Sequence, residues 1–218
     1  MKDDDINIVL HLVKKSNLWS AVPFLELLAK GVRDPFKILI ACVLSLRTRD
    51  RTTAEASARL FLLASDPFVM ANLSVKKIEK AIYPVGFYRT KAKQILAISK
   101  KICQEFQGTV PDTIDDLMRL PGVGRKTANL VRTVGYKKLG ICVDVHVHRI
   151  CNRVGYVSTK HPDDTELILR QKLPKKYWIK LNGLLVTFGQ NQCTPISPQC
   201  SSCLISPYCQ RIGVLAFR

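Results

Sequence analysis

Four cysteines near the carboxyl end of the sequence lie within seventeen residues of one another, spaced as Cys193-x6-Cys200-x2-Cys203-x5-Cys209. Thiolates grouped so closely are typical ligands of zinc or of an iron–sulfur cluster, and the residue type alone does not decide between the two. Zinc ribbons usually carry two Cys-x2-Cys pairs, whereas this segment has one. The spacing therefore predicts a metal centre held by all four side chains.

A turn with two glycines is a second place where chemistry could occur. Residues 120–128 read Leu-Pro-Gly-Val-Gly-Arg-Lys-Thr-Ala. Gly122 and Gly124 let main-chain N–H groups come close to a ligand, and the start of the following helix adds positive charge. Such a turn suits the phosphates of a nucleic-acid backbone without reading the bases. By default, Lys126 would be one more phosphate contact.

A single carboxylate, Asp144, lies in an otherwise apolar segment between Val143 and Val145. Its residue type and its position before a helical stretch predict a helix N-cap. A carboxylate held in this way could also accept a proton or stabilise developing positive charge. We therefore expect Asp144 to combine a structural role with a chemical one.

These segments, in their order along the chain, resemble the endonuclease III family of DNA base-excision glycosylases. The hairpin at 120–128 is similar to the family's helix-hairpin-helix, residues 143–149 to the segment with its catalytic aspartate, and the cysteine spacing to its cluster loop. Similar residues at 43–45 and 86–88 extend the resemblance over about residues 30 to 210.

The resemblance implies a bifunctional DNA glycosylase and AP lyase that removes oxidised pyrimidines such as thymine glycol. Lys126 would attack the sugar C1′ and form a Schiff base, after which β-elimination cuts the strand. Its amine must be neutral to attack, and partial desolvation, Arg125 and the helix N-terminus all favour that form. Asp144 would take the proton or stabilise the cationic sugar. Relatives without this lysine release the base and stop.

The resemblance also implies a 4Fe-4S cluster on the four cysteines and duplex DNA with damaged bases or abasic sites as the partner. Arg47 and Phe87 fall at the positions of the side chains that fill the gap left by a flipped nucleotide. The family commonly has glutamine where this chain has Arg47. The predicted DNA-binding residues are Gly122, Val123, Gly124, Arg125, Arg47, Phe87 and Arg149.

The distribution of basic residues differs from the better-known family pattern. The interval between Cys193 and Cys200 carries no positive charge, so phosphate binding should depend more on the hairpin and on other basic residues. Candidates are Lys37, Arg89, Lys91 and Lys93. Arg153, one turn after Arg149 on the same helix face, would join the DNA-binding surface or pair with acidic side chains.

The elements that position these residues are predicted to be helices throughout. Apolar residues recur at i, i+3, i+4 and i+7, for example at Ile6, Val9, Leu10 and Val13, and no convincing alternating strand is found. We expect an all-α helix-hairpin-helix glycosylase fold with two helical domains. Residues 28–138 form a bundle of about six helices, and residues 1–27 with 139–218 form the cluster domain. The active cleft would lie between them.

Composition narrows the function classes. The chain has 218 residues and a net charge of +17, from 34 Lys and Arg against 17 Asp and Glu, while 47% of its residues are hydrophobic. These values predict a folded protein with an acidic partner such as DNA. Neither a membrane span nor a leader segment is recognised, so we expect a monomeric, cytoplasmic protein whose cysteines are not paired in disulfides.

Two alternatives remain open from the sequence. One is a noncatalytic helix-hairpin-helix module that only binds DNA, which Lys126 and Asp144 argue against. The other is a mismatch-directed glycosylase for uracil, thymine or adenine. Ala41 stands where the adenine-specific relative has a glutamate, which argues against adenine. The damaged base itself depends on the shape of the pocket.

Overall fold

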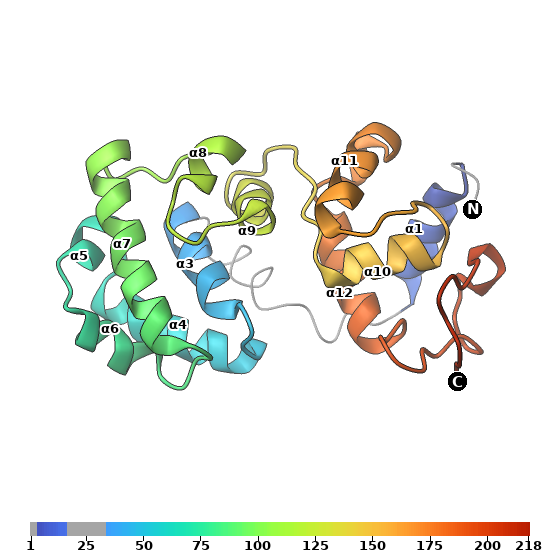
Figure 1. Ribbon diagram of the computed structural model, residues 1–218, viewed down its shortest axis with the longest axis horizontal. Helices are drawn as coiled ribbons and strands as arrows, with labels where there is room; N and C mark the ends of the chain where they lie inside the picture. The colour runs from blue at the N-terminus through green and yellow to red at the C-terminus, as the bar shows by residue number, and fades with distance from the viewer. Residues whose placement is uncertain (1–3, 17–33) are drawn as a thin grey trace. The chain divides into compact units, whose positions relative to one another are not determined.

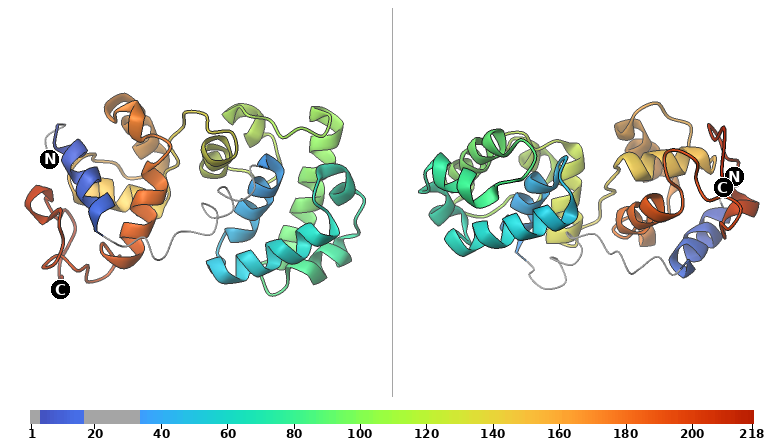
Figure 2. Two further views of the ribbon diagram at one scale, coloured as in Figure 1. Left: turned by 180° about the vertical axis from the view of Figure 1, so that it is seen from behind. Right: turned by 90° about the horizontal axis from the view of Figure 1, so that it is seen from below.

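The computed structural model describes residues 4–16 and 34–218, and every regular element within them is helical (Figures 1 and 2). No β-strand occurs in these two ranges. The all-α fold predicted from the hydrophobic period is therefore confirmed. None of the described helices is both long enough and apolar enough to cross a bilayer.

The chain divides into two compact units. One unit contains α1 (Asp5–Lys15) together with Leu139–Arg218. The other contains the helices α3 to α9 and ends at Lys138. Each unit has an apolar core of its own. The domain boundary predicted at residues 27 and 28 lies outside the described residues.

The unit that ends at Lys138, which we call the bundle unit, is built around α3. Residues Ile38–Leu44 of this helix are all buried, and α3 contacts α4, α7 and α9. Asp34 starts α3 by accepting a hydrogen bond from the Phe36 N–H at 2.9 Å, and Pro35 follows at the first helical position. The helices of this unit are α3 (Pro35–Ser45), α4 (Asp50–Leu63), α5 (Pro67–Ala71), α6 (Val75–Ile82), α7 (Tyr88–Phe106), α8 (Ile114–Met118) and α9 (Arg125–Leu130), the last of which continues into the π-helical turn Val131–Gly135.

Seven α-helices are therefore described in the bundle unit. The sequence predicted about six for residues 28–138, a range whose first residues are not described. The shortest elements, α5 and α8, have five residues each. Each begins at its own capping side chain, Asp66 or Thr113, which compensates for the few internal hydrogen bonds that so short a helix can make.

The other unit, which we call the cysteine unit, joins both ends of the chain. It contains α1, α10 (Val145–Arg153), α11 (Pro162–Lys172) and α12 (Leu181–Asn191), and α12 contacts both α1 and α10. The predicted apolar stripe of α1 is buried in this core. After Asn191 the only helical element is the 3-10 turn Ser206–Tyr208.

Candidate active site and metal centre

The predicted hairpin lies between α8 and α9. Gly122 has a left-handed backbone with φ +66°, and a Cβ there would lie 2.3 Å from the Gln94 amide nitrogen, which donates to the Pro121 carbonyl at 3.0 Å. Gly124 differs, because its φ is −90° and a Cβ would meet nothing within 4 Å. Gly122 is thus required by the fold, whereas Gly124 leaves open space beside an exposed backbone.

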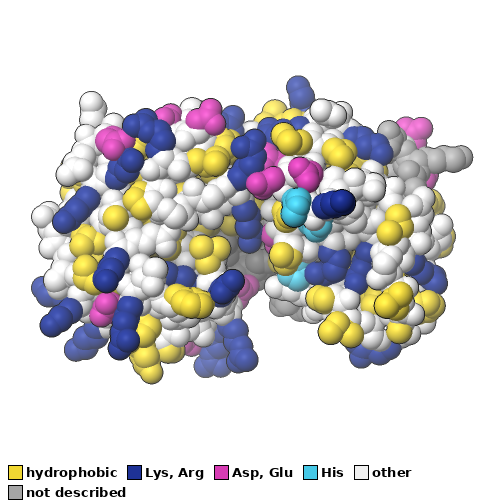
Figure 3. Space-filling model, in the orientation of Figure 1, with side chains coloured by type: hydrophobic (Ala, Val, Ile, Leu, Met, Phe, Trp, Pro, Cys, Tyr) yellow, Lys and Arg dark blue, Asp and Glu magenta, His cyan; other side chains and the backbone are white. Residues whose placement is uncertain are grey.

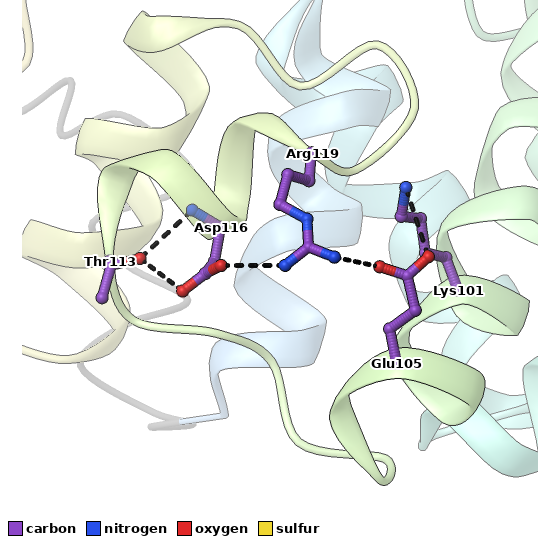
Figure 4. Close-up of polar contacts among 5 residues, drawn as sticks. All are labelled: Lys101, Glu105, Thr113, Asp116 and Arg119. Atoms are coloured by element: carbon purple, nitrogen blue, oxygen red, sulfur yellow. Dashed lines mark hydrogen bonds and ion pairs between the residues drawn. The ribbon is translucent and has the colours of Figure 1, made fainter.

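The helix before the hairpin is fixed to α7 by a chain of polar contacts (Figure 4). Thr113 caps α8 by accepting from the Asp116 N–H at 3.1 Å, and its hydroxyl donates to the Asp116 carboxylate at 2.7 Å. Arg119 then bridges Asp116 at 3.1 Å and Glu105 of α7 at 2.6 Å, and Glu105 also contacts Lys101. Thr113 is thus the N-cap of α8.

Lys126 is the second residue of α9 and its side chain is exposed. The next three residues are buried, so α9 turns its other side toward the core. Burial raises the pKa of the Cys42 thiol on α3 to about 12, and the positive charge of Lys126 opposes that rise.

Asp144 is nearly buried, with 9% of its surface exposed, and it is the N-cap of α10. Its Oδ1 accepts hydrogen bonds from the N–H groups of His146 and Val147, both at 2.9 Å. The predicted cap is confirmed. Because both cap bonds go to Oδ1, Oδ2 is not needed to hold the helix. The carboxylate is thus fixed in orientation by the helix that it starts.

Arg47 and Phe87, predicted to enter the duplex, contact each other in the bundle unit. The guanidinium carbon of Arg47 lies 5.7 Å from the centre of the Phe87 ring, and both side chains are exposed. Both residues also have left-handed backbones, with φ of 52° and 57°. Non-glycine residues rarely adopt this conformation, so the surrounding structure must hold them in it.

Lys91 was predicted to contact phosphate, and this prediction is wrong. Its side chain is buried and its ammonium donates to the Leu44 and Leu46 carbonyls and to the Thr48 hydroxyl. The sequence contained a signal for this placement, because Lys91 falls on the same helical stripe as the buried Ile95, Ile98 and Ile102.

The four cysteines predicted as ligands line one cavity of the cysteine unit. Burial raises the pKa of Cys203 to about 11, and repulsion from the other three sulfurs raises it as well. In the parts of the chain that are described, no three His, Cys, Asp or Glu side chains converge as a ready-made site for one ion. The four sulfurs therefore surround a space rather than meet at a point.

Arg153 holds the segment that carries these cysteines. Its guanidinium donates to the carbonyls of Thr194 and Pro195, both at 2.6 Å, and lies 3.5 Å from the Cys193 sulfur. Its own carbonyl accepts from the Ile212 N–H at 3.0 Å. With only 9% of its surface exposed, Arg153 is not part of a DNA-binding surface, and that expectation is wrong.

Arg149 is used in a similar way, one turn earlier on α10. Its Nη2 donates to the carbonyls of Gly189 and Cys193, both at 2.9 Å. These bonds tie α10 to the end of α12 and to the first cysteine. These bonds place Nη2 inside the cysteine unit, and a DNA contact by Arg149 stays a prediction.

Basic side chains are spread over the visible face of each unit, with acidic ones among them (Figure 3). The ammonium of Lys37 lies 6.0 Å from the centre of the Phe61 ring. Arg89 stacks over Tyr88 at 5.4 Å, and Lys93 is exposed on α7. These three residues, unlike Lys91, remain candidates for phosphate contact.

Comparisons with known proteins place the chain among DNA-repair proteins. Residues 40–175 match the family model described as HhH-GPD superfamily base excision DNA repair protein. Endonuclease III of Thermotoga maritima is 44% identical over 177 residues, which cover 81% of this chain and 83% of that protein. Endonuclease III homolog 2 of Arabidopsis thaliana is 43% identical over 80% of this chain, and the match spans only 47% of the plant protein.

A solved structure of a trapped covalent intermediate between endonuclease III and DNA superposes with a TM-score of 0.86. It is 32% identical in sequence, and the match covers 97% of both chains. The likeness therefore includes both units and the segment that carries the four cysteines.

Proposed function

The chain belongs to the endonuclease III family of base-excision repair proteins, and on that premise we propose that it is a DNA glycosylase and AP lyase. Its substrate is an oxidised pyrimidine, such as thymine glycol, in duplex DNA. One observation carries the proposal: an exposed lysine, Lys126, follows the open hairpin glycine Gly124 by two residues, in the motif that the family uses.

The hairpin binds the DNA backbone. The main chain at Gly124 is exposed and has open space beside it, so a phosphate can approach its N–H group closely. Arg125 adds a positive charge next to it. Because these contacts involve no base edges, they hold the strand without selecting its sequence. Lesion recognition then depends on extrusion of the nucleotide.

Lys126 and Asp144 divide the chemistry. The neutral amine of Lys126 attacks C1′, the bond from C1′ to the base breaks, and the base leaves with a proton. The nitrogen then displaces O4′ from C1′, which opens the sugar ring; O4′ takes up a proton and an iminium remains. This iminium acidifies C2′, so loss of a C2′ proton expels the 3′ phosphate, and water later frees the lysine. Asp144 accepts the proton from the amine and stabilises positive charge on the sugar, in an orientation set by its cap hydrogen bonds.

We also propose that Cys193, Cys200, Cys203 and Cys209 hold a 4Fe-4S cluster. Four thiols around one cavity suit a bulky cluster with one cysteine for each iron, and their spacing has a single Cys-x2-Cys pair. When bound, the cluster cross-links the segment between α12 and the end of the chain. The monomeric state and cytoplasmic location expected from the sequence stay predictions.

Borohydride trapping tests the proposal. Reduction during turnover on a duplex that contains thymine glycol or an abasic site should link protein and DNA covalently, because only an amine forms a reducible iminium. Lys126→Gln should abolish both trapping and nicking while DNA binding is kept. Lys80→Gln, a change at another exposed lysine of the bundle unit, is the matched control.

Asp144→Asn extends the same test. It should bind DNA comparably but release the base about 10²-fold more slowly, the usual scale for loss of a positioned acid–base group. Base release by the wild type with no trappable adduct would show that Lys126 only contacts phosphate. Binding without release from any lesion would favour the noncatalytic module, and release from uracil or thymine mismatches alone would favour the mismatch-directed enzyme.

A further inference from the structure

The turn that carries Arg47 and the turn that carries Phe87 touch at their backbones. The Gly86 N–H donates to the Thr48 hydroxyl at 3.2 Å. A Cβ at Gly86 would lie 2.7 Å from the Arg47 carbonyl oxygen, so no other residue fits there without a shift of the main chain. The stacked pair of Arg47 and Phe87 therefore rests on two turns that have little freedom to move apart.

Lys91 binds the turn that carries Arg47 from its buried side. From α7, its ammonium donates to the Leu44 carbonyl at 2.8 Å, the Leu46 carbonyl at 2.5 Å and the Thr48 hydroxyl at 3.2 Å. A protonated lysine has three N–H donors, and all three are used here. The acceptors come from the end of α3 and from both residues that flank Arg47.

Burial of the Lys91 ammonium costs desolvation free energy, which an apolar side chain at this position would not. Only 5% of the Lys91 surface is exposed, and burial lowers the pKa of its amine to about 8. Methionine would fill similar space on the apolar stripe of α7 without a charge to desolvate. The three directed hydrogen bonds to one turn are what the ammonium provides and methionine cannot.

We propose that Lys91 is a positioning residue that fixes the turn at 46–48, so that Arg47 and Phe87 enter a duplex as one rigid pair. The proposal rests on the proposed function, in which those two side chains fill the space left by the extruded nucleotide. Lys91 itself does not touch DNA. Without its hydrogen bonds, the left-handed residue Arg47 relaxes and the pair no longer pushes between the bases.

The two roles, rigid positioning and plain stability, predict different outcomes for Lys91→Met. Arg47 and Phe87 must unstack the bases of a duplex before the abasic sugar reaches Lys126, whereas a single strand needs no such unstacking. A duplex with a tetrahydrofuran abasic analogue opposite 2-aminopurine reports unstacking by fluorescence and requires no catalysis. A single-stranded abasic oligonucleotide with borohydride reports the chemistry of Lys126 and requires no unstacking.

We expect Lys91→Met to lose most of the fluorescence rise at saturating protein and to trap abasic duplex about tenfold less, the effect of 1.4 kcal/mol. Trapping of the single strand should stay within about twofold of the wild type, a difference below 0.5 kcal/mol. Lys100→Met, at an exposed position of α7, is the matched control. Thr48→Val, which removes the hydroxyl shared by Lys91 and Gly86, should reproduce the duplex-selective loss if Lys91→Met does not fold.

Equal losses on both substrates, or no loss on the duplex, would overturn the proposal. A normal fluorescence rise with Lys91→Met would overturn it as well. If the wild type unstacks the duplex and Lys91→Met does not, but neither protein traps either substrate, the proposed lyase function fails while the positioning role stands. The two failures are therefore distinguishable in one set of measurements.

Discussion

The bundle unit and the last part of the cysteine unit differ in what holds their shape. In the bundle unit, helices from α3 to α9 surround a continuous apolar core in which α3 is buried on nearly every side. Residues 192–218 have one 3-10 turn, contribute a single large buried apolar side chain, Ile205, and depend on polar contacts from Arg149 and Arg153. Apolar burial specifies the first region, whereas the second is arranged around four cysteines.

This difference indicates that residues 192–218 need a bound group to be stably folded. A segment with so little core of its own cannot offset the loss of chain entropy by burial alone. Metal sites supply the missing free energy in such segments, because ligand binding and folding are coupled. Changes in the two regions should therefore have separable effects on stability and on iron content.

The largest effect is expected for Cys200→Ser. The wild type should be yellow-brown and contain about four irons per chain. Loss of one thiolate should remove most of that iron and lower the soluble yield, because assembly of the site is coupled to folding. Iron analysis and visible absorbance measure the loss of the cluster. Cys103→Ser on α7 is the control. Stoichiometric zinc in anaerobically prepared wild type would refute the cluster.

A smaller effect, confined to the other region, is expected for Ile95→Ala. Ile95 is fully buried in the core of the bundle unit, so truncation should lower the free energy of unfolding by about 2–5 kcal/mol. Iron content should not change. Denaturant titration with iron analysis on the same sample tests both statements, and Leu62→Ala, at an exposed site, is the control. Loss of iron with Ile95→Ala would break the comparison between the regions.

The smallest effect is expected for Gly124→Ala. Its backbone conformation suits any residue and a Cβ meets nothing, so stability should stay within about 0.5 kcal/mol. The added methyl would stand where a phosphate approaches, so affinity for undamaged duplex should fall several-fold. Gly122→Ala should instead destabilise the protein, because φ there is +66°. Equal behaviour of the two variants would contradict this distinction.

Local features of both units could be predicted from the sequence. The caps at Thr113 and Asp144, the stripe of α1 and the buried α3 follow from residue type and spacing over a few positions. Such features need only near neighbours along the chain, which a single sequence displays.

The roles of Lys91 and Arg153 were not predicted, because their partners are backbone carbonyls far away in sequence. Lys91 reaches Leu44, 47 residues earlier, and Arg153 reaches Thr194, 41 residues later. A carbonyl carries no residue identity, so no sequence pattern marks it as an acceptor. Only the register of Lys91 with the buried isoleucines of α7 indicated that it points inward.

The composition of the cysteine unit from α1 and Leu139–Arg218 has a consequence for synthesis on the ribosome. Helix α1 is translated before the bundle unit, but its partner α12 begins only at Leu181. The bundle unit is complete in sequence long before then and can fold as the chain emerges. The apolar face of α1 is therefore not covered by α12 until α12 has been made, so the unit that carries the four cysteines can close only after that point.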